Sequence, residues 1–166
     1  MGLVIPLGML DKREYVSRLL KAKDDAFKLA KTLIDATDLV IRPLKPSDLG
    51  VSGNEWTFNV SSGNNSIVTE ELDNKTLIVI FGIYNLSTNP QVNEVKFGTP
   101  ARTTEDVYIE DMYMYDNPGV IIEKPVTFQP GSTIEITAVA KGSNTAEKLG
   151  FVGFVIEPAG RTIGAK

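Results

Sequence analysis

The strongest constraint on the fold is a change of pattern around Pro43 and Pro46. Proline cannot continue a helix, so these residues end any helix that comes before them. From there to the C-terminus the chain consists of short apolar or alternating runs, separated by clusters of Gly, Pro, Asn and Ser. Many short runs at this spacing are typical of an antiparallel β-sandwich or barrel. The sequence therefore predicts a β-rich body that follows an N-terminal segment of another kind.

Two of the expected strands have the composition of central strands. Residues 76–84 and 149–156 are nearly continuous apolar sequence, which indicates strands that are covered on both faces. Gly153 lies within the second of these and is small enough for another side chain or backbone to approach it closely. By contrast, residues 133–137 alternate, so one face of that strand is expected to be solvated. In full, we expect strands near residues 38–42, 55–60, 66–71, 76–84, 92–97, 106–115, 120–128, 132–140 and 149–157.

Residues 11–36 carry the clearest helical pattern in the chain. Asp11 can cap the first turn, and Glu14 three positions later completes a capping-box pattern. Apolar residues recur at helical spacing, and most lysines and arginines lie on or beside the opposite face. We expect the apolar stripe to pack on the protein's own β-body; a neighbouring copy or a lipid surface is the alternative. The stripe comprises Tyr15, Val16, Leu19, Leu20, Ala22, Ala26, Phe27, Ala30, Leu33 and Ile34.

The first ten residues include an apolar run that is too short to span a bilayer. It has no basic region before it and no small-residue cleavage site after it, so we do not interpret it as a signal peptide. One interpretation is that it folds back as an edge strand or plug. The other is an arm that docks on a neighbouring subunit or a membrane, with Leu3, Ile5, Leu7 and Met9 as the contact residues.

Composition argues against several classes of function. The 166 residues include no histidine and no cysteine, which removes the usual general base, the thiolate nucleophile and most zinc ligands. Residues 1–45 carry nine basic and six acidic residues, a net charge of +3; residues 46–166 carry eight and fifteen, a net charge of −7. An acidic body disfavours a nucleic-acid site, which needs clustered cations. We therefore expect no enzyme activity, no cofactor, no metal site and no nucleic-acid partner.

The densest group of polar side chains lies in residues 105–116, which contain five carboxylates and three tyrosines. On an extended strand, Asp106, Tyr108 and Glu110 would share one face, and Asp111, Tyr113 and Tyr115 the other. Calcium binding needs oxygens that converge, whereas a strand spreads them apart. We expect a solvated or interfacial strand here, with its exposed tyrosines as assembly contacts among Tyr108, Tyr113 and Tyr115.

Trp56 is the only tryptophan in the chain. We expect it to cap the core of the sandwich, as a large amphipathic ring commonly does. The alternative is that it forms a ligand face, such as a platform for a sugar ring.

The whole arrangement resembles a known family. A short apolar N-terminus and one amphipathic helix precede the β-body. Within the β-body, the resemblance rests on residues 77–84, on the Gln129-Pro130-Gly131-Ser132-Thr133 turn that leads into 134–140, and on the C-terminal residues 150–160. This is similar to the single jelly-roll major capsid proteins of membrane-containing icosahedral viruses of bacteria and archaea. The resemblance covers roughly residues 38–160 and implies assembly in many copies. It supplies no catalytic residues.

We therefore expect an all-β fold, an antiparallel sandwich of eight to nine strands with jelly-roll-like connections and one N-terminal amphipathic helix. Residues 1–37 would form the arm and helix, 38–160 the sandwich and 161–166 a short tail. The expected function is that of a self-assembling virion shell component, which contacts copies of itself, other virion proteins and possible membrane lipid through its N-terminal segment. Its location would be the virion, or otherwise a soluble compartment. The alternative is a carbohydrate-binding or cell-surface adhesion module that uses Trp56.

Overall fold

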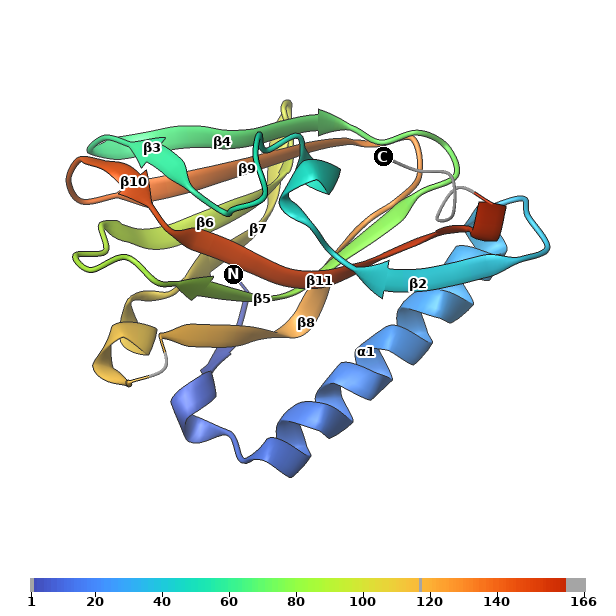
Figure 1. The fold of residues 1–166 in the computed structure, drawn as a ribbon, viewed down its shortest axis with the longest axis horizontal. Helices are drawn as coiled ribbons and strands as arrows, with labels where there is room; N and C mark the ends of the chain where they lie inside the picture. The colour runs from blue at the N-terminus through green and yellow to red at the C-terminus, as the bar shows by residue number, and fades with distance from the viewer. Residues whose placement is uncertain (1, 117, 161–166) are drawn as a thin grey trace.

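The computed structural model describes residues 2–116 and 118–160, and these form a β-sandwich with one long helix (Figure 1). The N-terminal part comprises strand β1 (Val4–Pro6), the 3-10 helix η1 (Leu7–Met9) and helix α1 (Lys12–Leu33). The remaining elements are β2 (Leu39–Pro43), η2 (Pro46–Leu49), β3 (Phe58–Val60), β4 (Gly63–Glu71), β5 (Leu77–Asn85), β6 (Val92–Thr99), β7 (Arg102–Tyr108), η3 (Glu110–Met114), β8 (Gly119–Phe128), β9 (Thr133–Ala140), β10 (Asn144–Glu147) and β11 (Leu149–Pro158).

The strands form two main sheets. One has the order β1-β8-β5-β11-β2 and the other the order β4-β9-β6-β7, while β3 and β10 form a short separate pair. Four antiparallel pairs are nested along the chain. The innermost pair is β6 with β7, and it is enclosed in sequence by β5 with β8, then by β4 with β9, and finally by β2 with β11. The chain thus folds as a long hairpin whose successive strand pairs alternate between the two sheets.

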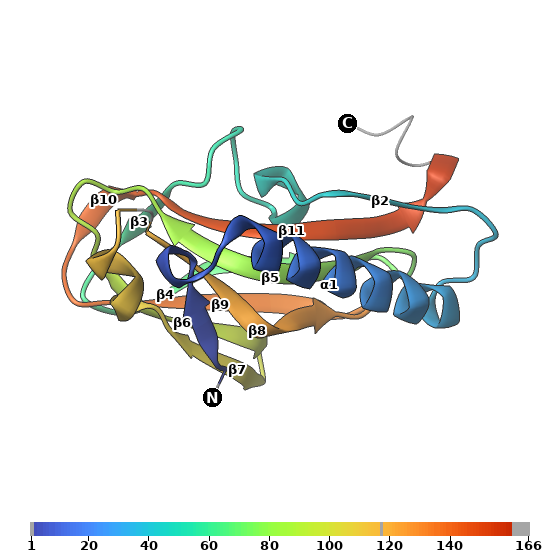
Figure 2. The same ribbon diagram turned by 90° about the horizontal axis from the view of Figure 1, so that it is seen from below.

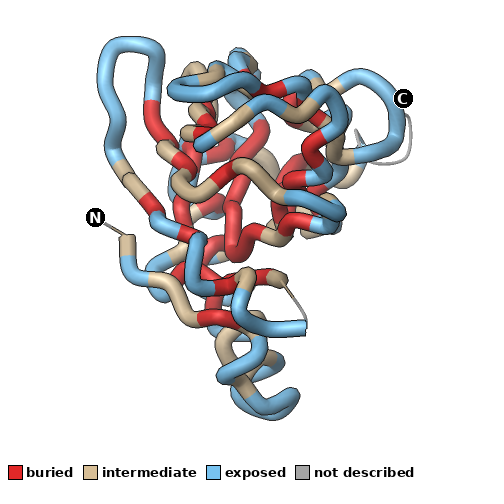
Figure 3. Tube along the Cα trace, turned by 90° about the vertical axis from the view of Figure 1, so that its left-hand side faces the viewer, coloured by how far each residue is buried: buried red, intermediate tan, exposed pale blue. Residues whose placement is uncertain are grey.

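Two apolar cores hold these layers together. The first fills the space between the two sheets and includes Phe97, Ile136 and Phe151, all of which are nearly inaccessible to solvent. The second lies between α1 and the outer face of the five-stranded sheet, where Phe81 and Phe154 are buried. Figure 2 shows α1 running across this sheet, and Figure 3 shows buried residues concentrated between the layers. The strand β5 is therefore buried on both faces, which confirms the interpretation of its continuous apolar sequence.

Helix α1 has the start that the capping pattern predicts. The Asp11 carboxylate accepts a hydrogen bond of 2.7 Å from the backbone N–H of Glu14. Ala22, Ala26 and Ala30 recur every four residues and are buried against the sheet, where their small side chains let the helix approach closely. The expectation that the apolar stripe packs on the protein's own β-body is confirmed for most of its residues. Val16, Leu20 and Leu33 are the exceptions, since they remain exposed.

The backbone of β11 bends where the sequence places a glycine. The pairing of β11 with β5 shifts register between Val152 and Gly153. A Cβ atom added to Gly153 would overlap the carbonyl oxygen of Val79, so only glycine allows this approach. The predicted close approach at Gly153 is thus confirmed.

The structure departs from the sequence prediction at three places. The strand expected over 106–115 is wrong beyond Tyr108, because the chain turns into η3, from which Ile109 and Met112 both insert into the core. Strand β10, of four residues, was not among the predicted strands, and β1, of three residues, was predicted only as one of two interpretations of the N-terminal run. They pair only at the edge of the main sheet or in a separate ribbon, and such short segments carry too few residues to show a period. The predicted tail at 161–166 lies outside the described residues.

Candidate functional site

The N-terminal arm folds back onto the sandwich. Its strand β1 pairs with β8, and the backbone N–H of Gly2 donates a 2.8 Å hydrogen bond to the carbonyl oxygen of Asp106 on β7. The arm therefore contacts edge strands of both sheets, as the edge-strand interpretation predicted. Of the predicted contact residues, Ile5 and Leu7 pack against the core beneath α1, whereas Leu3 and Met9 remain 67% and 65% exposed.

The three predicted contact tyrosines have different environments. Tyr108 ends β7 and is 49% exposed, and Tyr115 follows η3 and is 37% exposed. The hydroxyl of Tyr113 instead donates a 2.5 Å hydrogen bond to the carbonyl oxygen of Val92 and accepts one of 3.1 Å from Asn85 Nδ2. Burial raises the pKa of Tyr113 well above its usual range. Tyr113 thus belongs to the interior of the fold, and we omit it from the candidate contact surface.

The expected sharing of faces around these tyrosines holds only for the part that remains a strand. Asp106 and Tyr108 are two residues apart on β7 and therefore share a face, as predicted. Glu110 and Asp111 lie in the first turn of η3. In a 3-10 helix, side chains three residues apart lie above one another, so Ile109 and Met112 point into the core together. Glu110 and Asp111, which lie between Ile109 and Met112 in the sequence, consequently face solvent.

The folded chain brings one end of the arm against the η3 segment. Gly8, in η1, lies directly against the ring of Tyr115, and a Cβ atom at Gly8 would overlap that ring. The neighbouring Met9 is exposed, and so is Met114, at 83%. Two predicted contact residues that are far apart in sequence, Met9 and Tyr115, are thus held close together by the fold. Their proximity was not predicted, since it depends on the turn at Ile109.

A buried carboxylate that the sequence analysis missed lies at the η3 end of the sandwich. Glu147 is fully buried, and its Oε2 accepts hydrogen bonds from Asn85 Nδ2 and from the backbone N–H groups of Gln91 and Val92 at 2.8–2.9 Å. Its Oε1 accepts a 2.7 Å hydrogen bond from Asn144 Nδ2. Burial alone would raise the pKa of Glu147, but these four hydrogen bonds outweigh it and leave the pKa below its ordinary value. A single glutamate after a turn gives no sequence signal for such a role.

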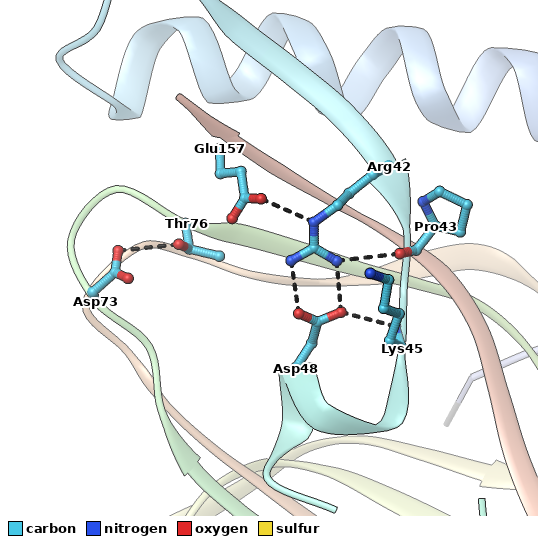
Figure 4. A network of polar contacts seen from close by, with 7 residues as sticks. All are labelled: Arg42, Pro43, Lys45, Asp48, Asp73, Thr76 and Glu157. Atoms are coloured by element: carbon cyan, nitrogen blue, oxygen red, sulfur yellow. Dashed lines mark hydrogen bonds and ion pairs between the residues drawn. The ribbon is translucent and has the colours of Figure 1, made fainter. Parts of the chain in front are cut away.

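A second polar network lies along the antiparallel pairing of β2 with β11, at the edge of the five-stranded sheet (Figure 4). The guanidinium of Arg42 makes two hydrogen bonds to the Asp48 carboxylate, at 2.7 and 2.8 Å, and one of 2.8 Å to Glu157. All three side chains are at least four-fifths buried. Because the network joins β2, η2 and β11, its role is to fix this edge of the sheet, and it belongs to the fold.

Trp56 lies at the edge of the inter-sheet core, as predicted. Its ring meets Phe151 edge-to-face, with centroids 5.4 Å apart. It also lines a surface pocket of about 310 Å³ together with Glu55, Tyr84 and Lys148. The two interpretations of Trp56, a cap on the core and a ligand face, are therefore compatible in space.

Two carboxyl groups lie close together between β6 and β7. Glu94 on β6 and Asp106 on β7 are neighbours in adjacent strands, and the nearby Asp106 carboxyl group, together with burial, raises the pKa of Glu94. Residues 2–116 and 118–160 contain no group of three or more acidic, histidine or cysteine side chains that could hold a metal ion.

The part of the chain that the structure describes also has no helix long and apolar enough to cross a membrane.

The chain matches no protein-family model, no curated protein and no solved structure.

Proposed function

We propose that this protein is a structural, self-assembling shell protein with a jelly-roll sandwich, and that it serves as a virion component. The fold supports this proposal through its nested strand pairing. A jelly roll places eight strands in two four-stranded sheets by wrapping two Greek keys. The order β8-β5-β11-β2 opposite β4-β9-β6-β7, with β1 added at one edge, supports the jelly-roll part of the proposal. A fold hosts many functions, so the assembly role needs an argument from the surface as well.

That argument rests on where the large apolar side chains are exposed. The described residues include nine exposed large apolar side chains, and eight of them lie either in the first 33 residues or between 108 and 115. Single exposed apolar residues are ordinary, whereas a concentration in two segments that meet at Gly8 and Tyr115 is typical of an interface. Methionine and tyrosine are also enriched in protein interfaces. A shell protein would bury this surface against its neighbours and would need no catalytic group.

The exposed part of the arm provides the test. We expect the wild-type protein to form larger species as its concentration rises in sedimentation velocity. Replacing Leu3 and Met9 with serine should raise the concentration needed for assembly by at least about tenfold, because each buried apolar side chain contributes about 1.5–3 kcal/mol. Leu86→Ser is the matched control, since Leu86 is 61% exposed but lies outside both segments. Unchanged assembly by the Leu3/Met9 variant would exclude the arm from the interface.

A second candidate function is a carbohydrate-binding or adhesion module. It is favoured by one observation, the pocket in which Trp56 and Tyr84 lie beside Glu55 and Lys148. Aromatic rings next to polar and charged groups suit a sugar, which has apolar faces and many hydroxyl groups. A glycan-array screen of the wild-type protein and Trp56→Ala tests this function. A saccharide signal that the variant loses would support it, and no signal for either protein would count against it.

A further inference from the structure

Helix α1 has an exposed face on which all the cations are paired. Arg18 with Glu14, Lys21 with Asp25, and Lys28 with Asp24 form ion pairs one helical turn apart, with nitrogen–oxygen distances of 2.7–3.2 Å. Each cation on this face is thus neutralised by a carboxylate of the same helix. Such exposed pairs stabilise the helix slightly and leave little net charge for a partner.

The adjoining side of α1 is different, and we call it the basic stripe. Val16 and Leu20 are 41% and 59% exposed. Phe27, which lies seven residues and about two turns after Leu20, is half-buried. At 3.6 residues per turn, four cations flank these apolar residues. No salt bridge joins these cations to a carboxylate within residues 2–116 and 118–160. The four cations are Lys12, Arg13, Lys23 and Lys31.

A surface of the opposite kind surrounds η3, and we call it the acidic corner. It comprises the exposed residues Glu110, Asp111, Met114, Tyr115 and Asp116. No salt bridge in the described part of the chain involves its three carboxylates. The corner therefore combines three unpaired negative charges with the exposed side chains of Met114 and Tyr115. The stripe likewise combines four positive charges with the exposed side chains of Val16 and Leu20.

The stripe begins near the corner of the same molecule, since Gly8 contacts Tyr115 and Lys12 follows four residues later, but it extends away from the corner along α1. Helix α1 is 22 residues long, which corresponds to roughly 33 Å. Figures 1 and 2 both show it running away from η3 towards the start of β2. Most of the stripe is consequently out of reach of the corner of the same copy. Each surface is left facing solvent although the other would complement it.

We propose that the basic stripe of one copy docks on the acidic corner of a second copy of this chain. This inference rests on the proposed assembly function and names the surfaces that perform it. Opposite charges at the rim would steer and orient the encounter, and the apolar residues between them would be removed from water. An anionic membrane would also attract the stripe, but it would leave the acidic corner without a partner. Charge complementarity between two surfaces of the same chain therefore favours a second copy.

Two charge-reversal variants test the contact. The stripe variant places glutamate at three stripe positions, two of which are in the first turn of α1, where negative charge favours the helix. The corner variant places lysine at the three exposed carboxylates of the corner. The substitutions are Lys12→Glu, Arg13→Glu and Lys23→Glu in the stripe variant, and Glu110→Lys, Asp111→Lys and Asp116→Lys in the corner variant.

Matched controls make the same changes in net charge at exposed residues elsewhere. They separate the loss of a specific contact from a general effect of total charge on association. Urea unfolding followed by Trp56 fluorescence checks that each variant folds. The control for the stripe variant is Lys75→Glu with Lys124→Glu and Lys141→Glu; the control for the corner variant is Asp38→Lys with Glu71→Lys and Glu123→Lys.

Each variant alone should need at least about a tenfold higher concentration to assemble in light scattering, while its control assembles as the wild type does. An equimolar mixture of the two variants should recover assembly, since each reversed surface then meets a reversed partner. Normal assembly by either variant alone, or failure of the folded mixture to recover, would overturn the inference while leaving the proposed function intact. A wild-type protein that never assembles would instead remove the proposed function. Anionic vesicles of phosphatidylserine and phosphatidylcholine supply the last arm: binding lost only in the stripe variant, with self-assembly unaffected, would assign the stripe to lipid and overturn the contact.

Discussion

Replacing Glu147 provides a quantitative test of how this end of the sandwich is held. The fully buried carboxylate accepts four hydrogen bonds and thereby connects β10 with the end of β5 and the start of β6. In Glu147→Ala, two buried backbone N–H groups and two amide donors lose their acceptor. Each unsatisfied buried donor costs about 1–3 kcal/mol, and relaxation and water entry recover part of the sum. We expect the free energy of unfolding to fall by about 3–5 kcal/mol.

The variant Glu147→Gln removes the negative charge of the side chain but keeps an oxygen that can accept hydrogen bonds, so it measures the effect of the charge alone. The glutamine oxygen can take the position of Oε2 and keep three of the four hydrogen bonds, while its amide faces Asn144. Asn144 can rotate its side-chain amide to present its oxygen instead, but it then gives up the 3.2 Å hydrogen bond that this oxygen accepts from the backbone N–H of Ala146. The expected loss is therefore smaller, about 1–2 kcal/mol, and reflects weaker hydrogen bonds to a neutral acceptor.

The dependence on pH has a definite sign. Because hydrogen bonding lowers the pKa of Glu147 in the folded state, its contribution to stability is fully present above the pKa of the unfolded chain, about 4.3. That contribution is lost as the pH falls below this value and through the folded-state pKa. The difference in stability between the wild type and Glu147→Gln should thus be constant from about pH 6 to 8 and shrink below about pH 4.3.

Urea unfolding followed by the fluorescence of Trp56 suits this comparison, since Trp56 packs against the core at Phe151. Glu147→Asp is a useful further control, because it keeps the charge but shortens the reach to the four donors. The reasoning would be refuted if Glu147→Ala lost less than about 1 kcal/mol, or if the gap between Glu147→Gln and the wild type widened at low pH.

Three further substitutions test other contacts, each by thermal or urea unfolding at neutral pH. Arg42→Lys should lower the free energy of unfolding by about 1–3 kcal/mol, because an ammonium cannot keep the two-pronged hydrogen bond to Asp48; wild-type stability would show that the network contributes nothing. Tyr113→Phe should cost about 1–2 kcal/mol, since Val92 loses the hydroxyl that binds its carbonyl oxygen; an unchanged unfolding midpoint would contradict this. Ala30→Leu should cost about 1–3 kcal/mol by forcing α1 away from the sheet, and a stabilised variant would mean that the helix contact has spare room.

The sequence was most informative where periodicity extends over many residues. The helix was predicted because Asp11, Glu14 and a long apolar stripe agree, and β5 because nine successive residues are almost all apolar. The general class, an antiparallel sandwich with one helix, follows from such signals. Short strands such as β1 give no comparable signal, since three residues cannot establish a period.

Other features depend on contacts between distant parts of the chain. The alternation around Tyr108 continues far enough to favour a longer strand, but burial of Ile109 and Met112 is better satisfied by a 3-10 turn. That turn then decides which acidic residues face solvent and brings Tyr115 to Gly8. The assembly role of the candidate contact residues stays a prediction, and their exposure and proximity could be known only from the fold.

Light scattering coupled to size-exclusion chromatography, over a wide range of protein concentration and with negative-stain images of each peak, tests the central proposal most directly. The account predicts a molar mass that rises with concentration, from the 18.1 kDa chain to rings, small oligomers or closed shells. A mass of one chain at every concentration would contradict it and would direct attention to the pocket at Trp56.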